Sequence, residues 1–388
     1  MLLTGTGRLA PGGRSPWAIV VRDGRIAWIG HPSDAPDDDE RIELGAALVT
    51  PGLVDSHTHP VFAGDRSDEA AARLEGQPYT EGGILRTVRA TRAADDATLE
   101  GLVERRLRAA LAAGTTTVEC KSGYGLSLDA ELGHLRLLGR VAERLPVRVV
   151  RTFLGAHAVP PEAASAAEHA ARVAEEMIPA VAADGLAEFV DVFADAGFFD
   201  LDATERVARA ALEAGLGVRL HAEQLARTGA AELGARLGAA SVDHLEQLDD
   251  AGVAAIASST TVATLLPAPA VVLRDRLPPA RALLAAGARV ALASDANAGT
   301  YGGFGTMPLV IGLGATLLDM TVGEAVTAAT AGGADALRRP DLGRLVAGAA
   351  ADLVAWDAEH EGAFALRLGS VRALRTWVAG REVTAGPL

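Results

Sequence analysis

The chain of 388 residues contains a single cysteine, Cys120, and this scarcity excludes several classes of protein at once. One cysteine cannot form an internal disulfide framework, nor can it build the multi-cysteine sites that usually hold structural zinc. Cys120 is expected to be a small buried packing residue rather than a nucleophile. The scarcity of thiols fits a reducing compartment, and we expect a cytoplasmic protein.

Long apolar runs and a basic surface are also missing. No uncharged apolar segment approaches the roughly 18–20 residues of a membrane-spanning helix. The start, MLLTGTGRLAPGG, lacks the cationic and apolar regions of a signal peptide. The formal net charge of −14 disfavours nucleic acid or an anionic membrane as a partner. An anionic small molecule would need a local cationic pocket.

Between the chain ends, short apolar runs alternate with alanine- and leucine-rich stretches. Segments 99–114 and 203–217 have helical spacing and end at or close to a glycine. We count about eight β-type runs, the number that a closed parallel (β/α)8 barrel of the α/β class requires. The alternative, a doubly wound open sheet, lacks its GxGxxG motif after an early strand. The runs are ALVTPGLVDSHTH, TTTVECKSGYG, VRVVRTFLGAHAV, EFVDVFADAG, GVRLHAEQ, ASVDHLE, TVATLLPA and RVALASDANAG.

The two chain ends differ from the middle. WAIVVRDGRIAWIG (17–30) has two β-type runs around Asp23-Gly24, which predicts a hairpin. Segments 351–357 and 371–383 are again short and β-rich. Neither end alone buries a sheet face well, so we expect both to form one small domain. We place that domain at 1–50 plus 346–388 and the barrel at 51–345.

Nearly every predicted barrel strand ends in polar side chains, where catalytic groups of such barrels lie. Two neutral histidines in an HxH pattern on a strand face the same way and can share a metal ion, although two surface histidines in a loop are the simpler alternative for the motif alone. Five of the nine histidines occupy strand ends, which favours the metal site. The residues at strand ends are His57, His59, Glu119, Lys121, Tyr124, His157, Asp191, Asp195, His221, Glu223, Gln224, His244, Glu246, Asp295 and Asn297.

A mixed set of donors, His57, His59 and His221 with Asp295, suits Zn²⁺ or Fe²⁺ with a position left open for water. Such an ion lowers the pKa of bound water from about 15.7 towards about 7. Asp295 can take the proton of that water and pass it to a leaving nitrogen. His244 can donate to a carbonyl oxygen as charge develops there, unless it is a core histidine bonded to the backbone.

These residues resemble those of the metal-dependent amidohydrolase superfamily, and more narrowly those of the imidazolonepropionase family. The resemblance runs nearly end to end. It implies a TIM barrel, a small β-sandwich from the two chain ends, and one zinc or iron ion per subunit. The implied reaction is hydrolysis of an anionic small molecule, 4-imidazolone-5-propanoate, to N-formimidoyl-L-glutamate. The motifs are LVTPGLVDSHTHPVFAGDRSDE, ECKSGYGL, RTFLGAHAVP, FVDVFADAGFF, LHAEQL, GAASVDHLE, TVATLLP and ALASDANAGT.

The resemblance also implies roles for single residues. His57, His59, His221 and Asp295 take the metal positions, and Gln224 takes a catalytic and substrate position. By this resemblance, the residues that contact the substrate are Arg66, Tyr124 and His157. Those that contact the carboxylates of the product are Asn297, Gly299 and Thr300.

Without the resemblance, these substrate contacts have simpler alternatives. Arg66 would be a solvated loop arginine paired with Asp65 or Asp68. Tyr124 could be a packing residue, and His157 could be a capping or core histidine. The backbone amides around Gly299 and Thr300 could cradle a carboxylate. Ala298, where proline is usual, and LLPAPA in place of LLPG are departures that could reshape the substrate rim.

Three other functions stay open. Binuclear amidohydrolases usually need a carboxylated lysine on a middle strand, and Lys121 comes too early. Amino-heterocycle deaminases often place an acid where this chain has Gln224, which cannot shuttle a proton. A metal-free binding or structural relative would lack ligands that this chain keeps. The resemblance also suggests a homodimer, and the roles of Glu119, Lys121, Asp191, Asp195 and Glu223 stay open.

Overall fold

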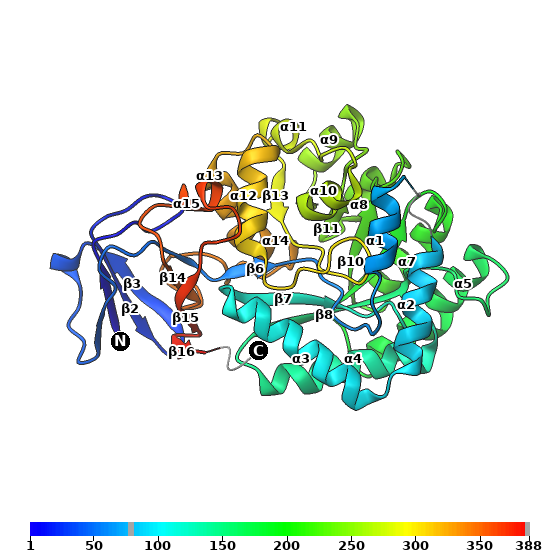
Figure 1. Cartoon of the computed structure of the whole chain (residues 1–388), viewed down its shortest axis with the longest axis horizontal. Coiled ribbons are helices and arrows are strands. Elements are labelled where there is room, and N and C mark those ends of the chain that lie inside the picture. The colour runs from blue at the N-terminus through cyan, green and yellow to red at the C-terminus, as the bar shows by residue number, and fades with distance from the viewer. Residues whose placement is uncertain (77–80, 385–388) are drawn as a thin grey trace.

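The computed structural model describes residues 1–76 and 81–384 and shows a barrel beside a pair of small sheets (Figure 1). The predicted ranges 51–345 and 346–388 include residues 77–80 and 385–388, which lie outside the described residues. The barrel sheet has eight parallel strands in chain order, one from each predicted run, so the predicted (β/α)8 barrel is confirmed. Its strands are β6 (Leu53–Asp55), β7 (Thr115–Lys121), β8 (Arg148–Ala156), β9 (Phe189–Ala194), β10 (Gly217–Ala222), β11 (Ser241–His244), β12 (Val262–Leu265) and β13 (Arg289–Leu292).

The barrel closes through backbone hydrogen bonds just beyond β6 and β13. Asp295 N donates to His57 O at 3.0 Å, and His59 N donates to Ala296 O at 2.9 Å. The closure therefore brings the HxH motif after the first strand beside Asp295, which follows the eighth.

Helices connect the barrel strands and cover the outer face of the sheet (Figure 1). In α3, the Asp95 side chain accepts a hydrogen bond from Thr98 N at 2.8 Å, which caps the helix, and Gly114 with φ of 84° follows its end. The helices are α1 (Ser67–Leu74), α2 (Glu81–Ala93), α3 (Asp96–Ala112), α4 (Leu128–Arg144), α5 (Ala166–Arg172), α6 (Ile178–Ala183), α7 (Leu201–Glu213), α8 (Ala230–Leu237), α9 (Asp250–Ala257), α10 (Pro267–Leu273), α11 (Ala280–Ala285), α12 (Met307–Leu317), α13 (Val322–Thr327), α14 (Gly333–Ala336) and α15 (Ala363–Leu366).

Strands from both chain ends form two four-stranded sheets, in the orders β3-β2-β1-β4 and β16-β15-β14-β5. The predicted hairpin over 17–30 is confirmed by the antiparallel pairing of β2 with β3, and β5 from the first segment pairs with β14 from the last. The strands are β1 (Leu2–Gly5), β2 (Trp17–Arg22), β3 (Arg25–Gly30), β4 (Arg41–Glu43), β5 (Val49–Pro51), β14 (Leu353–Trp356), β15 (Ala373–Val378) and β16 (Arg381–Val383).

One apolar core joins the two terminal sheets. Leu3, Trp17 and Ile19 from the first sheet pack with Leu353 and Trp377 from the second, all at most 1% exposed. Burial of these side chains between two sheets requires strands from both chain ends, so the two ends form one core. The expected small β-sandwich is confirmed, and its boundaries at residues 50 and 346 stay a prediction.

Candidate metal centre and active site

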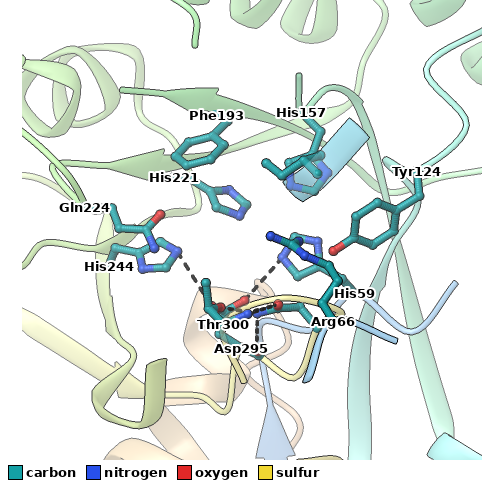
Figure 2. Close-up of a pocket in the computed structure, with 12 residues that line it drawn as sticks. His59, Arg66, Tyr124, His157, Phe193, His221, Gln224, His244, Asp295 and Thr300 are labelled. Carbon is teal, nitrogen blue, oxygen red and sulfur yellow. Dashed lines mark hydrogen bonds and ion pairs between the residues drawn. The ribbon is translucent and has the colours of Figure 1, made fainter. Parts of the chain in front are cut away.

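Ten of the twelve residues predicted to bind metal, bind substrate or catalyse line one cavity at the carboxyl end of the barrel (Figure 2). The other two are outside its lining: His57 lies in the adjoining histidine cluster, and Gly299 packs against Arg66. The remaining strand-end residues, Glu119, Lys121, Asp191, Asp195, Glu223 and Glu246, do not line the cavity. The lining residues are His59, Arg66, Ile84, Tyr124, His157, Phe193, His221, Gln224, His244, Asp295, Asn297 and Thr300.

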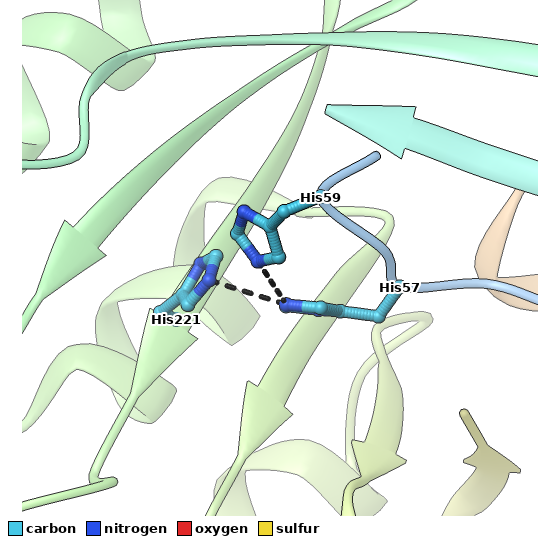
Figure 3. Close-up of side chains that lie close together, drawn as sticks. All are labelled: His57, His59 and His221. Carbon is cyan, nitrogen blue, oxygen red and sulfur yellow. Dashed lines mark hydrogen bonds between the residues drawn. The ribbon is translucent and has the colours of Figure 1, made fainter. Parts of the chain in front are cut away.

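Three imidazoles at the base of the cavity point their Nε2 atoms at one another (Figure 3). The His57 Nε2 atom lies 3.2 Å from His59 Nε2 and 3.2 Å from His221 Nε2. The Asp295 Oδ1 atom lies 3.3 Å from His59 Nε2 and 3.5 Å from His57 Nε2. All four side chains are buried.

Carboxylates behind two of the histidines fix which ring nitrogen carries the proton. His57 Nδ1 donates to Asp243 Oδ2 at 2.7 Å, and His221 Nδ1 donates to Asp191 Oδ1 at 3.1 Å. A proton held on Nδ1 leaves Nε2 with a bare lone pair. The lone pairs of His57 and His221 therefore face each other, which is repulsive unless a cation lies between them.

The donor spacing fits a metal ion. Ligand atoms at about 2.0–2.1 Å from a tetrahedral ion lie roughly 3.3–3.4 Å apart. The separations from His57 to His59, His221 and Asp295, and from His59 to Asp295, run from 3.2 to 3.5 Å. Three imidazoles and one carboxylate can thus hold a metal ion with the protonation states already set.

Burial sets the charge of these groups. Burial and the positive charge of Lys121 hold the pKa of His57 well below its ordinary value, and burial lowers the pKa of His59. Burial works to raise the pKa of Asp295, but its hydrogen bond with His59 and the charge of His244 outweigh this and lower the pKa. These shifts favour neutral imidazoles at His57 and His59 and an ionised carboxylate at Asp295, the forms that bind metal ions.

His244 lies across the cavity from His59, beside Gln224 (Figure 2). Its Nε2 atom is 4.0 Å from Asp295 Oδ2, and its Nδ1 atom is 3.6 Å from Glu246 Oε1. Burial lowers the pKa of His244, but the nearby Glu246 and Asp295 carboxylates outweigh this and raise it above the ordinary value. A protonated His244 can donate towards a ligand in the cavity.

Arg66 is a buried residue, not the solvated loop arginine of the alternative interpretation. It is 5% exposed, and its Nε atom donates to Glu69 Oε2 at 2.7 Å. Asp68 pairs instead with Arg86 at 2.8 Å. Arg66 therefore brings a guanidinium to the cavity of a strongly acidic protein.

Two glycines make the slot that holds this guanidinium. A Cβ atom at Gly83 or Gly299 would overlap the Arg66 guanidinium. Arg73 closes the slot from the same side, because its Nη2 atom donates to Gly299 O at 2.7 Å. Gly299 is thus required by close packing against Arg66.

Tyr124 and His157 form another part of the cavity wall. Their rings lie 5.1 Å apart between centroids, and the His157 ring stacks on His59 at 5.3 Å. His157 Nδ1 donates to Gly123 O at 2.9 Å, so Nε2 is left as an acceptor. Burial holds the pKa of His157 well below its ordinary value. His157 has the backbone bond of a core histidine and also lines the cavity.

The side chain of Asn297 is hydrogen-bonded to the backbone amides that were expected to cradle a carboxylate. Its Oδ1 atom accepts from Gly299 N at 2.7 Å and from Thr300 N at 2.8 Å. The side chain of Asn297 therefore already satisfies both amide donors, and their contact with a carboxylate stays a prediction. The Thr300 side chain still lines the cavity, 3.4 Å from Asp295 Oδ2.

Buried carboxylates hold the loops that carry the cavity residues. Glu131 accepts hydrogen bonds from three backbone amides within 123–126, at 2.8–3.0 Å. Asp195 accepts from three amides within 224–226, at 2.7–3.1 Å. Glu223 accepts from Gly229 N at 2.8 Å, which agrees with a structural role for that residue. Each acid fixes one loop after a strand.

Four residues that build or support the site were not predicted from the sequence: Asp243, Arg219, Phe193 and Glu131. Asp243 and Arg219 are fully buried on β11 and β10, and a charged residue inside an apolar strand is the signal that could have identified them. Phe193 looked like core, and Glu131 lies on a helix whose contact with the preceding loop has no short sequence pattern.

Among residues 1–76 and 81–384, no helix combines the length and the apolar character needed to span a bilayer.

Comparison with known proteins agrees with this site. The chain is 47% identical over 354 residues to the imidazolonepropionase of Mycolicibacterium smegmatis, covering 91% of this chain and 87% of that one. It is 45% identical over 390 residues to the imidazolonepropionase of Nocardia farcinica, covering 97% of each.

Solved structures with lower identity share the fold. The N-isopropylammelide isopropylaminohydrolase of Burkholderia multivorans is 22% identical with a TM-score of 0.77, covering 100% of both chains. The 5-methylcytosine deaminase of Klebsiella pneumoniae is 17% identical with a TM-score of 0.81, covering 100% of this chain and 99% of that one. The model of the amidohydrolase family matches residues 48–383. The chain therefore belongs to the amidohydrolase family and, within it, to the imidazolonepropionases.

Proposed function

We propose that this chain hydrolyses the ring amide of 4-imidazolone-5-propanoate to N-formimidoyl-L-glutamate with one zinc or iron ion. The observation that carries the proposal is the convergence of His57, His59, His221 and Asp295 within 3.2–3.5 Å contacts at the base of a cavity that also holds Arg66. The relatives named imidazolonepropionase support the substrate.

A metal ion held there would lower the pKa of water to about 7 and supply hydroxide at neutral pH. Asp295 has its Oδ1 atom towards the histidines and its Oδ2 atom towards His244 and Thr300. The Oδ2 atom is placed to accept the proton of the attacking water. Asp295 then returns that proton to the ring nitrogen as the bond between this nitrogen and the carbonyl carbon breaks.

His244 stabilises the carbonyl oxygen of the substrate. Its raised pKa favours the protonated imidazole, and a positioned donor acts most strongly when negative charge develops on the oxygen. The oxygen of water ends in a new carboxylate, and the ring nitrogen ends in the formimidoyl group.

Arg66 holds the propionate of the substrate. A guanidinium pairs with a carboxylate through two parallel hydrogen bonds, and the buried slot between Gly83 and Gly299 orients its plane. Tyr124, His157 and Gln224 line the space between Arg66 and the metal ligands, where the ring would lie. Asn297, Gly299 and Thr300 order the loop beside the new carboxylate.

The residue Gln224 argues against deamination. A deaminase of this architecture needs a carboxyl group to move protons to the leaving ammonia, and an amide side chain cannot do so. Contacts from Gln224 to the ring are compatible with hydrolysis, because Asp295 supplies the proton transfers. A cytoplasmic location and a homodimer stay predictions.

The experiment is an assay of the purified, metal-loaded protein with freshly made 4-imidazolone-5-propanoate beside hydantoins, dihydropyrimidines and aminopurines. We expect the imidazolone to be hydrolysed with kcat/KM in the range of about 10⁴–10⁸ M⁻¹s⁻¹ and the others at least about a hundredfold more slowly. Faster release of ammonia from an aminopurine would replace this proposal with deamination.

A further inference from the structure

Lys121 is the only lysine in the chain, and every other long basic side chain is an arginine. It lies on β7 in the barrel interior and is fully buried. A buried cation is costly unless it is paired, so a lone lysine at such a place suggests a task that arginine does not perform.

The ammonium of Lys121 bridges two carboxylates. Its Nζ atom lies 2.8 Å from Glu119 Oε1 and 2.7 Å from Asp191 Oδ2. Glu119 precedes it by two residues on the same strand, so both side chains point into the barrel. Asp191 comes from β9, two strands away. One compact charge therefore links two strands of the barrel.

The second oxygen of each carboxylate reaches the metal-binding segment. Asp191 Oδ1 accepts from His221 Nδ1 at 3.1 Å and from His221 N at 3.2 Å. Glu119 Oε2 accepts from Thr58 N at 3.1 Å, and Thr58 lies between the two histidines of the HxH motif. Lys121 is thus connected through one carboxylate, Asp191, to the ligand His221, and through another, Glu119, to the segment that carries His57 and His59.

The neighbouring cation, Arg219, has a different task that uses its planar fork. Its Nη2 atom donates to Ser56 O at 2.6 Å and to Asp243 Oδ2 at 3.0 Å, and its Nη1 atom donates to Ala336 O at 2.7 Å. These acceptors surround a guanidinium. Between Glu119 and Asp191, by contrast, two carboxylate oxygens converge on one atom, which suits a point charge with three donors.

The formal charges of this buried cluster depend on Lys121. Two cations, Lys121 and Arg219, stand against three carboxylates, Glu119, Asp191 and Asp243. The net charge of minus one, with that of Asp295, balances a divalent ion. Without the ammonium, the Oδ2 atom of Asp191 would lose its ion pair. The carboxylate would then turn away from His221 or hold that ring less rigidly.

We propose that Lys121 is a positioning residue for metal binding: its ammonium holds Asp191 and Glu119 so that His221, His57 and His59 direct their Nε2 atoms to one point, and a guanidinium does not replace it. This inference rests on the metal site of the proposed function, but not on the identity of the substrate.

The test compares zinc dissociation constants, measured by competition with a chromophoric chelator, in Lys121→Met, Lys121→Arg and Arg148→Met. Arg148 pairs with the buried Asp352 at 3.0 Å, away from the metal ligands, so it is a matched control for loss of a cation. We expect about 10–100-fold weaker zinc binding in both Lys121 variants and an unchanged constant in Arg148→Met. Zinc affinity within about threefold of wild type in Lys121→Met overturns the proposal, and such affinity in Lys121→Arg overturns the need for an ammonium.

A second measurement needs no variant. Because the chain has one lysine, wild-type protein labelled with ¹⁵N at lysine Nζ gives one assigned ammonium signal. We expect this signal to shift as zinc is added and to stop shifting at one equivalent; an unshifted signal at full zinc occupancy overturns the proposal. Wild type that binds zinc but does not hydrolyse the imidazolone would reject the proposed function alone.

Discussion

Asp243 Oδ2 lies 2.7 Å from His57 Nδ1, and this contact determines what the other ring nitrogen can do. With the proton on Nδ1, the Nε2 lone pair points at His59 and His221. Arg219 holds the same Asp243 oxygen at 3.0 Å, so the carboxylate cannot turn away. The histidine is oriented before any ion arrives, which reduces the cost of binding one.

Replacing Asp243 by asparagine tests this orientation. We expect Asp243→Asn to bind zinc about 10–100-fold more weakly, since the neutral amide holds the His57 proton less firmly. Asp352→Asn is the control, because Asp352 is also buried but pairs with Arg148 away from the ligands. The measurement is zinc release to a chelator followed by absorbance. Equal release rates in Asp243→Asn and wild type would contradict the role of Asp243.

Replacing Asp295 should lower kcat more than replacing any other single residue. We expect Asp295→Asn to lower kcat by at least about a hundredfold, because general acid–base catalysis contributes about 10²–10⁴-fold. The fold should remain, since Asp295 N still donates to His57 O. The measurement is steady-state kinetics alongside circular dichroism. A kcat within about tenfold of wild type would reject this role.

Arg66 should act on binding more than on chemistry. Charge-assisted hydrogen bonds contribute about 1.5–3 kcal/mol, so we expect Arg66→Ala to raise KM by about 10–100-fold and to change kcat less. The control is Arg86→Ala, which removes the exposed ion pair between Arg86 on α2 and Asp68 on α1. An unchanged KM in Arg66→Ala would show that the propionate binds elsewhere.

Asp55 should make stability depend on pH. It is buried, and burial raises its pKa to about 7 although it accepts hydrogen bonds from Ser294 N and Oγ. The unfolded value is about 3.9, so the folded state binds this proton more tightly. The contribution of Asp55 to stability is therefore full below about pH 4 and is lost as pH rises through about 7.

Urea unfolding of the metal-free proteins at about pH 5 and about pH 8 checks this dependence. Asp55→Asn should lack the decline, so its free energy of unfolding relative to wild type should rise by roughly 2–3 kcal/mol between those pH values. The same difference between the two proteins at both pH values would show that Asp55 does not titrate in this range.

The sequence predicted the barrel because local signals agreed with the final fold. Eight apolar runs became eight strands, and alternation in the HxH motif placed His57 and His59 on one face. The ends of strands meet at one rim in any closed parallel barrel, so strand-end residues such as His221 and Asp295 could be grouped without knowing a distance.

The partners of these residues could not be predicted because they depend on tertiary contacts. Glu69 pairs with Arg66 in place of the nearer Asp65 and Asp68, since the fold of α1 turns Glu69 towards the buried slot. The side chain of Asn297 accepts hydrogen bonds from the backbone amides of Gly299 and Thr300, and the local sequence does not specify the turn that makes this possible. Hydrogen-bond partners in loops follow from packing rather than from local pattern.

The central claim is that one metal ion, held by His57, His59, His221 and Asp295, is needed for hydrolysis of the imidazolone ring. The most direct test is titration of zinc or iron(II) into chelator-treated protein while the rate of 4-imidazolone-5-propanoate hydrolysis is recorded. We expect no hydrolysis without metal, a linear rise in rate that ends at one ion per chain, and no recovery in His57→Ala/His59→Ala. Hydrolysis that persists in metal-free protein, or that the double variant regains at one equivalent, would contradict it.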